Sequence, residues 1–174
     1  GPHPGRAPAA RAGVRAGDVA ATEQELERLA GAPGPVVPEA ERLYARGLAR
    51  YHARRDPTEA AELLTRAAAL DPPHRTRDLY TAARAVSRGF DDRRALALFR
   101  ELVRRYPRAP EADDARFQIA RTLIVLGDNP AAIAAYDEYL ALHGRTGDLV
   151  ESARYERAVA RLASGDGVRA EQEL

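Results

Sequence analysis

The chain lacks cysteine, methionine, tryptophan and lysine, and two of these absences exclude whole classes of chemistry. Without cysteine there is no disulfide, no thiol nucleophile and no cysteine-ligated metal site. All 27 basic residues are arginine, which excludes a Schiff-base lysine, a serine–lysine dyad and a phosphate-loop lysine. The sequence has no run of about 18 apolar residues, so we expect no transmembrane segment.

The composition that remains is that of a folded chain. Its 174 residues suit one ordinary domain or a short repeat array, and 45% hydrophobic residues are enough to form a core. Because methionine is absent, residue 1 is not a native start. The Gly1-Pro2 pair fits a scar left by tag cleavage, with removal of a signal peptide as an alternative.

Residues 1–37 differ in composition from the rest of the chain. The first 17 are rich in Gly, Pro, Ala and Arg and have no hydrophobic periodicity, which predicts a flexible leader. The segment from Thr22 to Glu25 has the pattern of a capping box and predicts a short helix near residues 22–30. Such a helix is marginal alone, so we expect it to dock on another element.

From Pro38 onward the apolar residues recur with helical spacing, and no stretch alternates convincingly as a strand would. Asp56, Asn129 and Asp148 are the expected N-caps, and short turns between helices predict antiparallel pairs. The expected helices cover residues 38–54, 57–70, 75–89, 92–106, 110–126, 130–143 and 148–164, with another beginning near 168.

Two ladders of residues recur at steps of 35 to 38 positions. In the first helix of each pair an aromatic residue precedes a small one by three positions: Tyr44 and Gly47, Tyr80 and Ala83, Phe117 and Ala120, Tyr155 and Ala158. In the second helix an alanine precedes a large residue by four: Ala60 and Leu64, Ala95 and Phe99, Ala132 and Tyr136, with Ala170 beginning a fourth step. Glycines close the first helices at Gly89, Gly127 and Gly165. Small residues let paired helices approach closely, so the ladders predict an all-α array of about three and a half helix pairs.

The ladders resemble the tetratricopeptide repeat. Phe117, Ala120, Gly127-Asp128, Ala132 and Tyr136 match its pattern best; Pro72 and Pro107 fall at its terminal proline, and Gly144 replaces that proline in the third copy. The period near 37 departs from the family's 34. The resemblance covers roughly residues 38–174 and implies a right-handed α-solenoid that binds or scaffolds other proteins.

A narrower resemblance concerns the junction from Arg104 to Ala115, where Tyr106-Pro107 precedes an acidic, alanine-rich helix. This junction looks like those of bacterial cell-envelope tetratricopeptide proteins, which implies a periplasmic or envelope location, with the cytoplasm as the alternative. The stretch Leu79 to Tyr106 is similar to the superhelical N-terminal region of soluble lytic transglycosylases. The alternative function is therefore a non-catalytic superhelical domain of such an enzyme, acting on peptidoglycan.

We predict no catalytic, cofactor-binding or metal-binding residue, and no enzyme activity. The histidines and serines lack metal-ligand or nucleophile spacing: His3, His52, His74, His143, Ser87, Ser152 and Ser164. The acid pairs Asp91-Asp92 and Asp113-Asp114 lie in first turns of expected helices, where acids complement the helix dipole.

The charge is uneven along the chain. Residues 71–110 contain 10 arginines and 5 acids, whereas residues 111–174 contain 7 arginines and 12 acids. The basic stretch is either a solvated helix face or a surface for an acidic partner. We expect no nucleic-acid partner, because no recognised module is present and the acidic half would repel phosphates.

The resemblance maps a concave binding face onto the first helices, where aromatic anchors and arginines would hold a protein or acidic peptide. Arg84 and Arg121 recur 37 positions apart, so we expect them to stack as a basic pair. The alternative is that Tyr80 and Phe117 are packing residues. The predicted face consists of Tyr80, Arg84, Arg88, Phe117, Arg121 and Ile124.

The chain ends at Leu174, partway through an expected second helix. A half pair leaves an apolar face uncovered. We therefore expect that the array is truncated at its C-terminus, or that a partner, including a second copy, covers this face.

Overall fold

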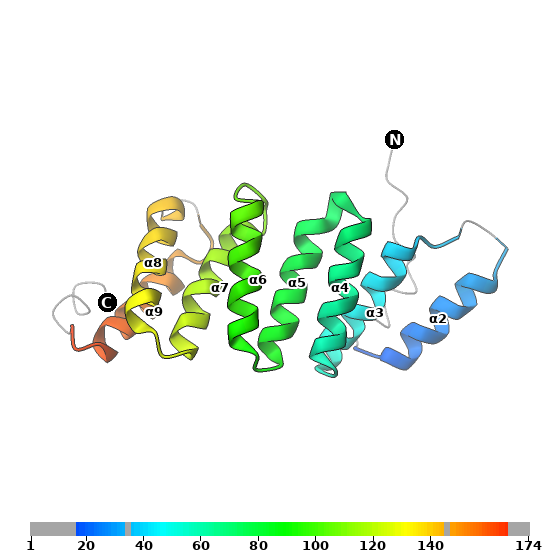
Figure 1. Ribbon diagram of the computed structural model, residues 1–174, viewed down its shortest axis with the longest axis horizontal. Helices are drawn as coiled ribbons and strands as arrows, with labels where there is room; N and C mark the ends of the chain where they lie inside the picture. Colours follow the sequence, from blue (N-terminus) through cyan, green and yellow to red (C-terminus); the bar gives the residue numbers. More distant parts are fainter. Residues whose placement is uncertain (1–16, 34–35, 145–146, 167–174) are drawn as a thin grey trace. The chain divides into compact units, whose positions relative to one another are not determined.

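The computed structural model describes residues 17–33, 36–144 and 147–166, and over these residues it is helical with no strand (Figure 1). The all-α prediction is therefore confirmed. The chain forms two compact units, the first ending at Asp91 and the second beginning at Asp92. The first holds α2 (Val19–Gly31), α3 (Glu39–Ala53), α4 (Pro57–Leu70), the 3-10 turn η1 (Pro72–His74) and α5 (Arg75–Arg88); the second holds α6 (Asp92–Arg105), α7 (Ala112–Val125), α8 (Asn129–His143) and α9 (Val150–Ala163).

In the first unit each helix packs on the next, from α2 to α5. The predicted close approach of the first pair is present at Gly47 of α3. A Cβ added there would lie 2.7 Å from Leu64 Cγ and 3.1 Å from the Ala60 carbonyl oxygen, both of α4. Ala60 and Leu64 are fully buried, so the small and large residues of the ladder play the packing roles expected of them.

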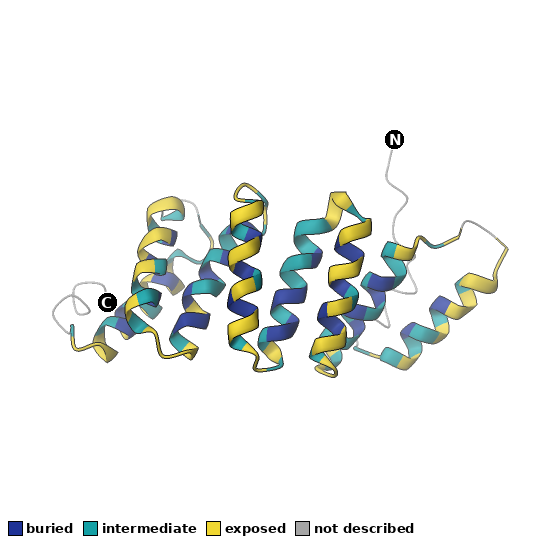
Figure 2. Cartoon of the chain, in the orientation of Figure 1, coloured by how far each residue is buried: buried dark blue, intermediate teal, exposed yellow. Residues whose placement is uncertain are grey.

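In the second unit α7 packs against both α6 and α8, and α8 packs against α9. Phe117 lies at the centre of its core, with ring centroids 5.9 Å from those of both Tyr136 and Tyr139 in edge-on geometry. Ala120 and Ala132 are fully buried, as the ladder predicts. Figure 2 shows the same division in both units, with buried positions between helices and exposed positions on their outer faces.

The helix starts differ in detail from the predicted caps. The helix expected near 22–30 begins at Val19, where Asp18 accepts a hydrogen bond from the Ala21 amide. The cap of α8 is Asp128, one residue before the predicted Asn129. Asp56 precedes α4 as expected but makes no side-chain cap bond there. The predicted cap at Asp148 is wrong, because α9 begins at Val150 after Leu149.

The predicted glycines close their helices at all three positions, since Gly89 is the C-cap residue of α5 and Gly127 and Gly165 directly follow the C-caps of α7 and α9. Gly127 and Gly165 have φ of 80° and 83°, a left-handed conformation that glycine adopts without steric cost. After α5 the left-handed residue is Phe90, with φ 63°, and not Gly89. Gly89 is small for another reason, because an added Cβ would lie 2.6 Å from Pro57 Cγ.

The remaining predictions for the chain ends concern residues that are not described. The leader before Gly17, the expected helix near 168 and Ala170 all fall there. None of the described helices is both long and apolar enough to cross a lipid bilayer.

Candidate binding surface

The α5 part of the predicted face carries two arginines beside aromatic rings. The Arg84 guanidinium carbon lies 5.9 Å from the Tyr80 ring centroid on the same helix. Arg88 reaches back to α3, where its guanidinium carbon lies 3.7 Å from the Tyr51 ring centroid. Its Nη1 also donates a hydrogen bond of 2.9 Å to the Tyr51 carbonyl oxygen. Arg88 therefore joins two first helices of the first unit through both a cation–π contact and a hydrogen bond.

Arg88 belongs to a cluster of arginines that sequence reasoning only partly identified. Burial lowers its pKa, and the nearby charges of Arg84 and Arg54 lower it further, against an opposite effect of Tyr51. Arg54 follows α3 in a left-handed conformation, with φ 54°. Among the described residues neither Arg54 nor Arg84 has an ion-pair partner. We call Arg54, Arg84 and Arg88, together with Tyr51, the Tyr51 arginine cluster.

A cavity of about 20 Å³ opens beside this cluster, enough for one water molecule. No acidic residue lines it. Its walls are formed by Arg50, Tyr51, Arg54, Arg55, Pro57, Ala85 and Arg88. Such an arrangement favours an anion, because a carboxylate can accept paired hydrogen bonds from guanidinium groups and relieve their mutual repulsion. The sequence signal for the missed residues was the Arg54-Arg55 pair directly before the turn to Pro57.

The α7 part of the predicted face has a different environment. Phe117 is only 4% exposed, so it is a packing residue, as the alternative interpretation of the sequence had it. Arg121 is half exposed but its Nε lies 3.3 Å from Glu156 Oε2 of α9. Ile124 is partly buried against the core. Arg84 and Arg121 belong to different units, and their stacking stays a prediction.

Glu156 also receives a hydrogen bond from the core. The hydroxyl of buried Tyr136 donates to Glu156 Oε2 at 2.5 Å. Burial and this bond to a carboxylate raise the pKa of Tyr136 well above its usual value. Arg121, Glu156 and Tyr136 thus link α7, α9 and α8. The charge of Arg121 is therefore compensated within the second unit by Glu156, which the sequence spacing did not reveal.

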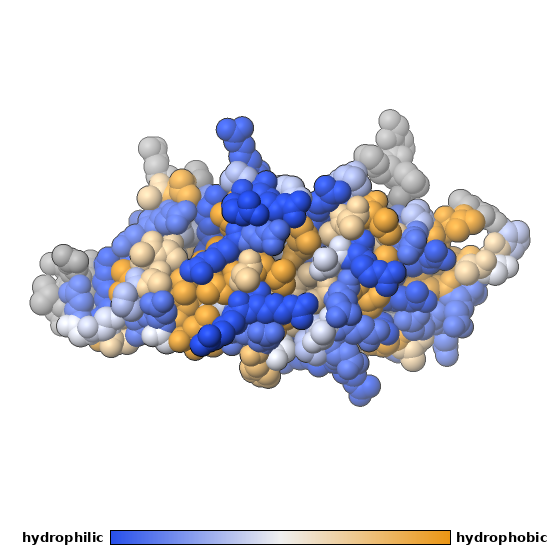
Figure 3. Space-filling view, in the orientation of Figure 1, coloured by the Kyte–Doolittle hydropathy of each residue, from blue (hydrophilic) through white to orange (hydrophobic). Residues whose placement is uncertain are grey.

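The second unit also contains a groove of about 410 Å³ that was not predicted from the sequence. Six of its lining residues are apolar, and the others are three arginines and one glutamate. Figure 3 shows hydrophobic surface between the hydrophilic atoms of α6 and α8. The lining residues are Arg100, Val103, Arg104, Arg116, Ile119, Leu123, Ala131, Ala134, Ala135 and Glu138. Sequence reasoning missed this groove because it assigned binding to the first helices only.

Metal chemistry finds no support in the described part of the chain, where no three His, Asp or Glu side chains are placed to hold an ion together. The described histidines lie apart. His74 Nδ1 lies 2.7 Å from Asp71 Oδ2 at the surface, and the His143 ring stacks beside Tyr139 with centroids 5.0 Å apart. These are ordinary structural contacts for histidine.

Solved structures of repeat proteins share this fold. TPR-like repeats from a Podosopora anserina protein assigned as a kinesin light chain superpose with a TM-score of 0.70 at 19% sequence identity, over 94% of this chain and 87% of that one. A second structure, of a variant of those repeats, gives the same values. The apo form of RapI superposes with a TM-score of 0.74 at 11% identity, over 94% of this chain and 64% of its own. No family model matches the chain, and no curated protein sequence matches it.

The chain therefore has the fold of a TPR-like repeat protein, an α-solenoid of antiparallel helix pairs. This confirms the fold class and the resemblance inferred from the ladders. Identities of 19% and 11% establish the fold alone.

Proposed function

We propose that the chain is a non-enzymatic protein-interaction module, and that its Tyr51 arginine cluster binds a carboxylate-rich peptide segment of a partner. The observation that carries the proposal is geometric: Arg54 and Arg88 line a cavity that no acid lines, and neither Arg54 nor Arg84 has an ion-pair partner among the described residues. An incoming carboxylate would gain charge-assisted hydrogen bonds and relieve the mutual repulsion of these guanidinium groups.

The aromatic rings of Tyr51 and Tyr80 hold the arginine side chains of this surface in place. Tyr51 lies under Arg88 and Tyr80 lies beside Arg84, so each guanidinium has a planar support that limits its motion. Preorganised arginines lose less side-chain entropy on binding than free ones. Arg121 is secondary here, because Glu156 already compensates its charge.

The test uses the full chain and a fluorescein-labelled decapeptide rich in glutamate, compared with a glutamine version. Fluorescence anisotropy should give at least tenfold tighter binding of the glutamate peptide, and Arg84→Ala/Arg88→Ala should remove this preference. The control Arg28→Ala/Arg105→Ala removes the same charge at exposed residues that pair with Glu25 and Glu101. Equal binding by the Arg84→Ala/Arg88→Ala variant and the control would disprove the proposal.

We extend the proposal to the bacterial cell envelope on the resemblance of the junction at Tyr106-Pro107. The alternative remains a superhelical domain that accompanies a lytic transglycosylase. Cosedimentation with purified peptidoglycan distinguishes the two. A chain that stays in the supernatant supports the protein-interaction role, and one that pellets supports the alternative.

A further inference from the structure

The first described helix, α2, packs on α3 through a small apolar interface. Leu26 of α2 is only 3% exposed and lies in a cluster with Ala45 and Ala49 of α3. Val19 and Leu48 extend this cluster from the two sides. The helix predicted to need a docking site therefore has one.

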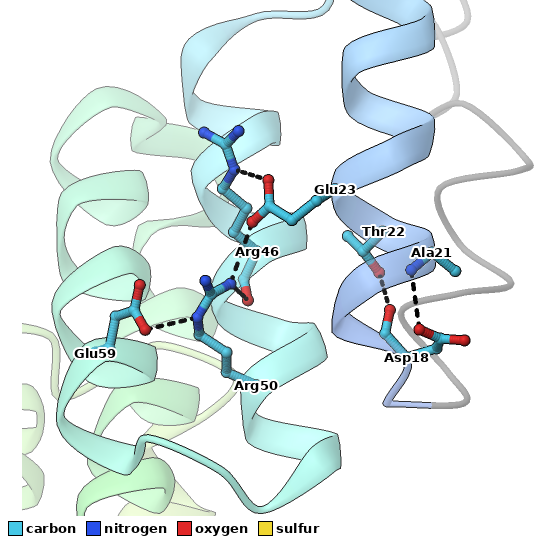
Figure 4. A network of polar contacts seen from close by, with 7 residues as sticks. All are labelled: Asp18, Ala21, Thr22, Glu23, Arg46, Arg50 and Glu59. Carbon is cyan, nitrogen blue, oxygen red and sulfur yellow. Dashed lines mark hydrogen bonds and ion pairs between the residues drawn. The ribbon is translucent and has the colours of Figure 1, made fainter.

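An ion-pair network fixes the same interface (Figure 4). Glu23 of α2 lies 2.8 Å from Arg46 Nε and 3.4 Å from Arg50 Nη1 of α3. Arg50 Nε also lies 2.8 Å from Glu59 Oε2 of α4. Burial lowers the pKa of Arg50, but the two glutamates outweigh burial and the net shift is upward. We call the residues of α3 in this contact the helix-receiving face: Ala45, Arg46, Leu48, Ala49 and Arg50.

A glycine at the start of α2 sets how closely the helix can approach. Gly17 has φ 65°, and a Cβ added to it would lie 2.7 Å from the Ala53 amide nitrogen and 2.9 Å from the His52 carbonyl carbon. Both neighbours are backbone atoms, which cannot rotate away as a side chain can. Any larger residue at position 17 must therefore move the start of α2 away from the end of α3.

The chain uses the same recognition chemistry a second time, between α8 and α9. Residues 19–26 read VAATEQEL and residues 133–140 read IAAYDEYL; residues 44–50 read YARGLAR and residues 155–161 read YERAVAR. Asp137 of α8 pairs with Arg157 and Arg161 of α9, as Glu23 of α2 pairs with Arg46 and Arg50 of α3. The α2 helix therefore corresponds to the second helix of a repeat pair. The described residues do not include a first helix for that pair.

The two helices differ in how firmly they are held. The α8 helix packs against both α7 and α9 and buries Tyr136 and Tyr139. Among the described elements the extensive packing of α2 is with α3, and its buried residues are Thr22 and Leu26. Glu25, at the position of Tyr139, instead pairs with Arg28 on the surface. A 13-residue helix with so small an interface opens at a lower free energy than the rest of its unit.

We propose that α2 is an exchangeable occupant of the helix-receiving face, and that this face binds an acidic amphipathic helix of a partner protein. The partner helix carries an acid three positions before a leucine, as both α2 and α8 do. Its carboxylate pairs with Arg46 and Arg50, and its leucine enters the cluster of Ala45 and Ala49. The α2 helix blocks this face until the partner displaces it. The helix-receiving face meets the cavity of the Tyr51 arginine cluster at Arg50, but it does not include Arg54, Arg84 or Arg88.

The test measures whether α2 can be exchanged. The probe is a labelled peptide of residues 18–31, added to the full chain and followed by fluorescence anisotropy. Wild type should bind it weakly because its own α2 covers the face. Gly17→Ala should bind it at least tenfold more tightly, because the added Cβ unseats α2. Gly31→Ala is the matched control, since an added Cβ there has no neighbour within 4 Å and should leave binding at the wild-type level.

Two further variants test which groups recognise the helix. In the Gly17→Ala background, Arg46→Ala should reduce peptide binding at least fivefold. A peptide carrying Glu23→Gln and Leu26→Ala should bind Gly17→Ala no better than wild type. If neither the Arg46→Ala substitution nor the altered peptide weakens binding, the helix-receiving face is not the binding site.

Other results would overturn the proposal outright. Equal peptide binding by Gly17→Ala and Gly31→Ala would mean that α2 does not block the face. Loss of the main helical melting transition in Gly17→Ala would mean that α2 is an integral part of the fold. A Gly17→Ala dimer that the peptide dissociates in sedimentation velocity would identify a second copy's α2, and not a partner helix, as the occupant.

Discussion

Arg88 of α5 stacks over Tyr51 of α3 at 3.7 Å and so lies close to His52, the next residue along that helix. Burial lowers the pKa of His52 below 6.5, and the positive charge of Arg88 lowers it further. The Tyr51 arginine cluster therefore has a histidine that reports on its charge. This allows the electrostatics of the candidate surface to be tested without knowing its ligand.

Arg88→Ala should raise the pKa of His52 towards 6.5, because it removes the repulsion while leaving most of the burial. The measurement is an NMR titration of the histidine ring protons. Because the folded state disfavours protonated His52, this group's contribution to stability falls as the pH decreases through 6.5. Arg28→Ala is the control, since Arg28 pairs with Glu25 on the exposed side of α2. An unchanged His52 pKa in Arg88→Ala would contradict the role assigned to Arg88.

The close approach of α3 and α4 gives a prediction on stability. Gly47→Val should destabilise the protein by about 1–3 kcal/mol, because its Cβ would collide with Leu64 and the Ala60 carbonyl. We expect a similar loss for Ala132→Leu in the core of the second unit. Urea denaturation followed by circular dichroism measures both. Gly31→Ala should not destabilise, since its Cβ meets nothing, and a loss in that control as large as in Gly47→Val would refute the packing argument.

These packing sites could be predicted from the sequence because each pair of contacts depends on a local, repeated pattern. Gly47 and Leu64 lie 17 positions apart within one helix pair, and the ladder repeats that spacing closely in the next two pairs. The ion-pair partners of exposed charged residues were harder to predict from the sequence. Nothing in the spacing around Arg121 indicates that Glu156, 35 positions later, would compensate its charge. Ion pairs between neighbouring repeats depend on side-chain reach, which a one-dimensional pattern does not contain.

The role of α2 was missed for a related reason. Its likeness to α8 is visible in residues 19–26 and 133–140, but the ladders consist of aromatic and small residues, and Thr22 stands where Tyr136 stands in α8. The cap positions were also displaced, since Asp18 and Thr22 are both capping residue types and only the folded chain shows which one begins the helix.

The Tyr136–Glu156 bond gives a prediction at alkaline pH. Because the chain has no lysine, its tyrosines dominate titration between about pH 9.5 and 11.5. The pKa of Tyr136 is raised by burial and by the bond to Glu156, so the unfolded chain loses this proton at a lower pH than the folded one. Stability should therefore fall as the pH rises through 10, the ordinary tyrosine value.

Tyr136→Phe should make this alkaline decline shallower, while costing about 1–2 kcal/mol at pH 7 through loss of the hydrogen bond to a carboxylate. Thermal melts at pH 7 and at half-unit steps from pH 9.5 to 11.5 measure both effects. The comparison variant is Tyr155→Phe, because the Tyr155 ring is 61% exposed. Parallel pH profiles for wild type and Tyr136→Phe would show that Tyr136 does not control the decline.

The turn after α5 gives a prediction in the opposite direction, towards higher stability. Phe90 has φ 63° and is 90% exposed, so its side chain strains the backbone and packs against little. A non-glycine residue in the left-handed conformation destabilises the folded state by about 1–2 kcal/mol. Glycine at the same place removes this strain, but it destabilises the protein by about 0.4–1 kcal/mol because the unfolded chain gains conformational freedom. Phe90→Gly should therefore stabilise the protein by about 0.5–1 kcal/mol in urea denaturation.

The matched test of this backbone argument is Gly127, which closes α7 with φ 80° and has open space where a Cβ would be. Gly127→Ala introduces the strain that Phe90→Gly removes, so it should destabilise by about 1 kcal/mol with no change in packing. The two substitutions should shift the urea midpoint in opposite directions and leave its slope unchanged. If Phe90→Gly instead lowers the midpoint, the Phe90 ring contributes a contact worth more than the strain, and the turn is held by its side chain.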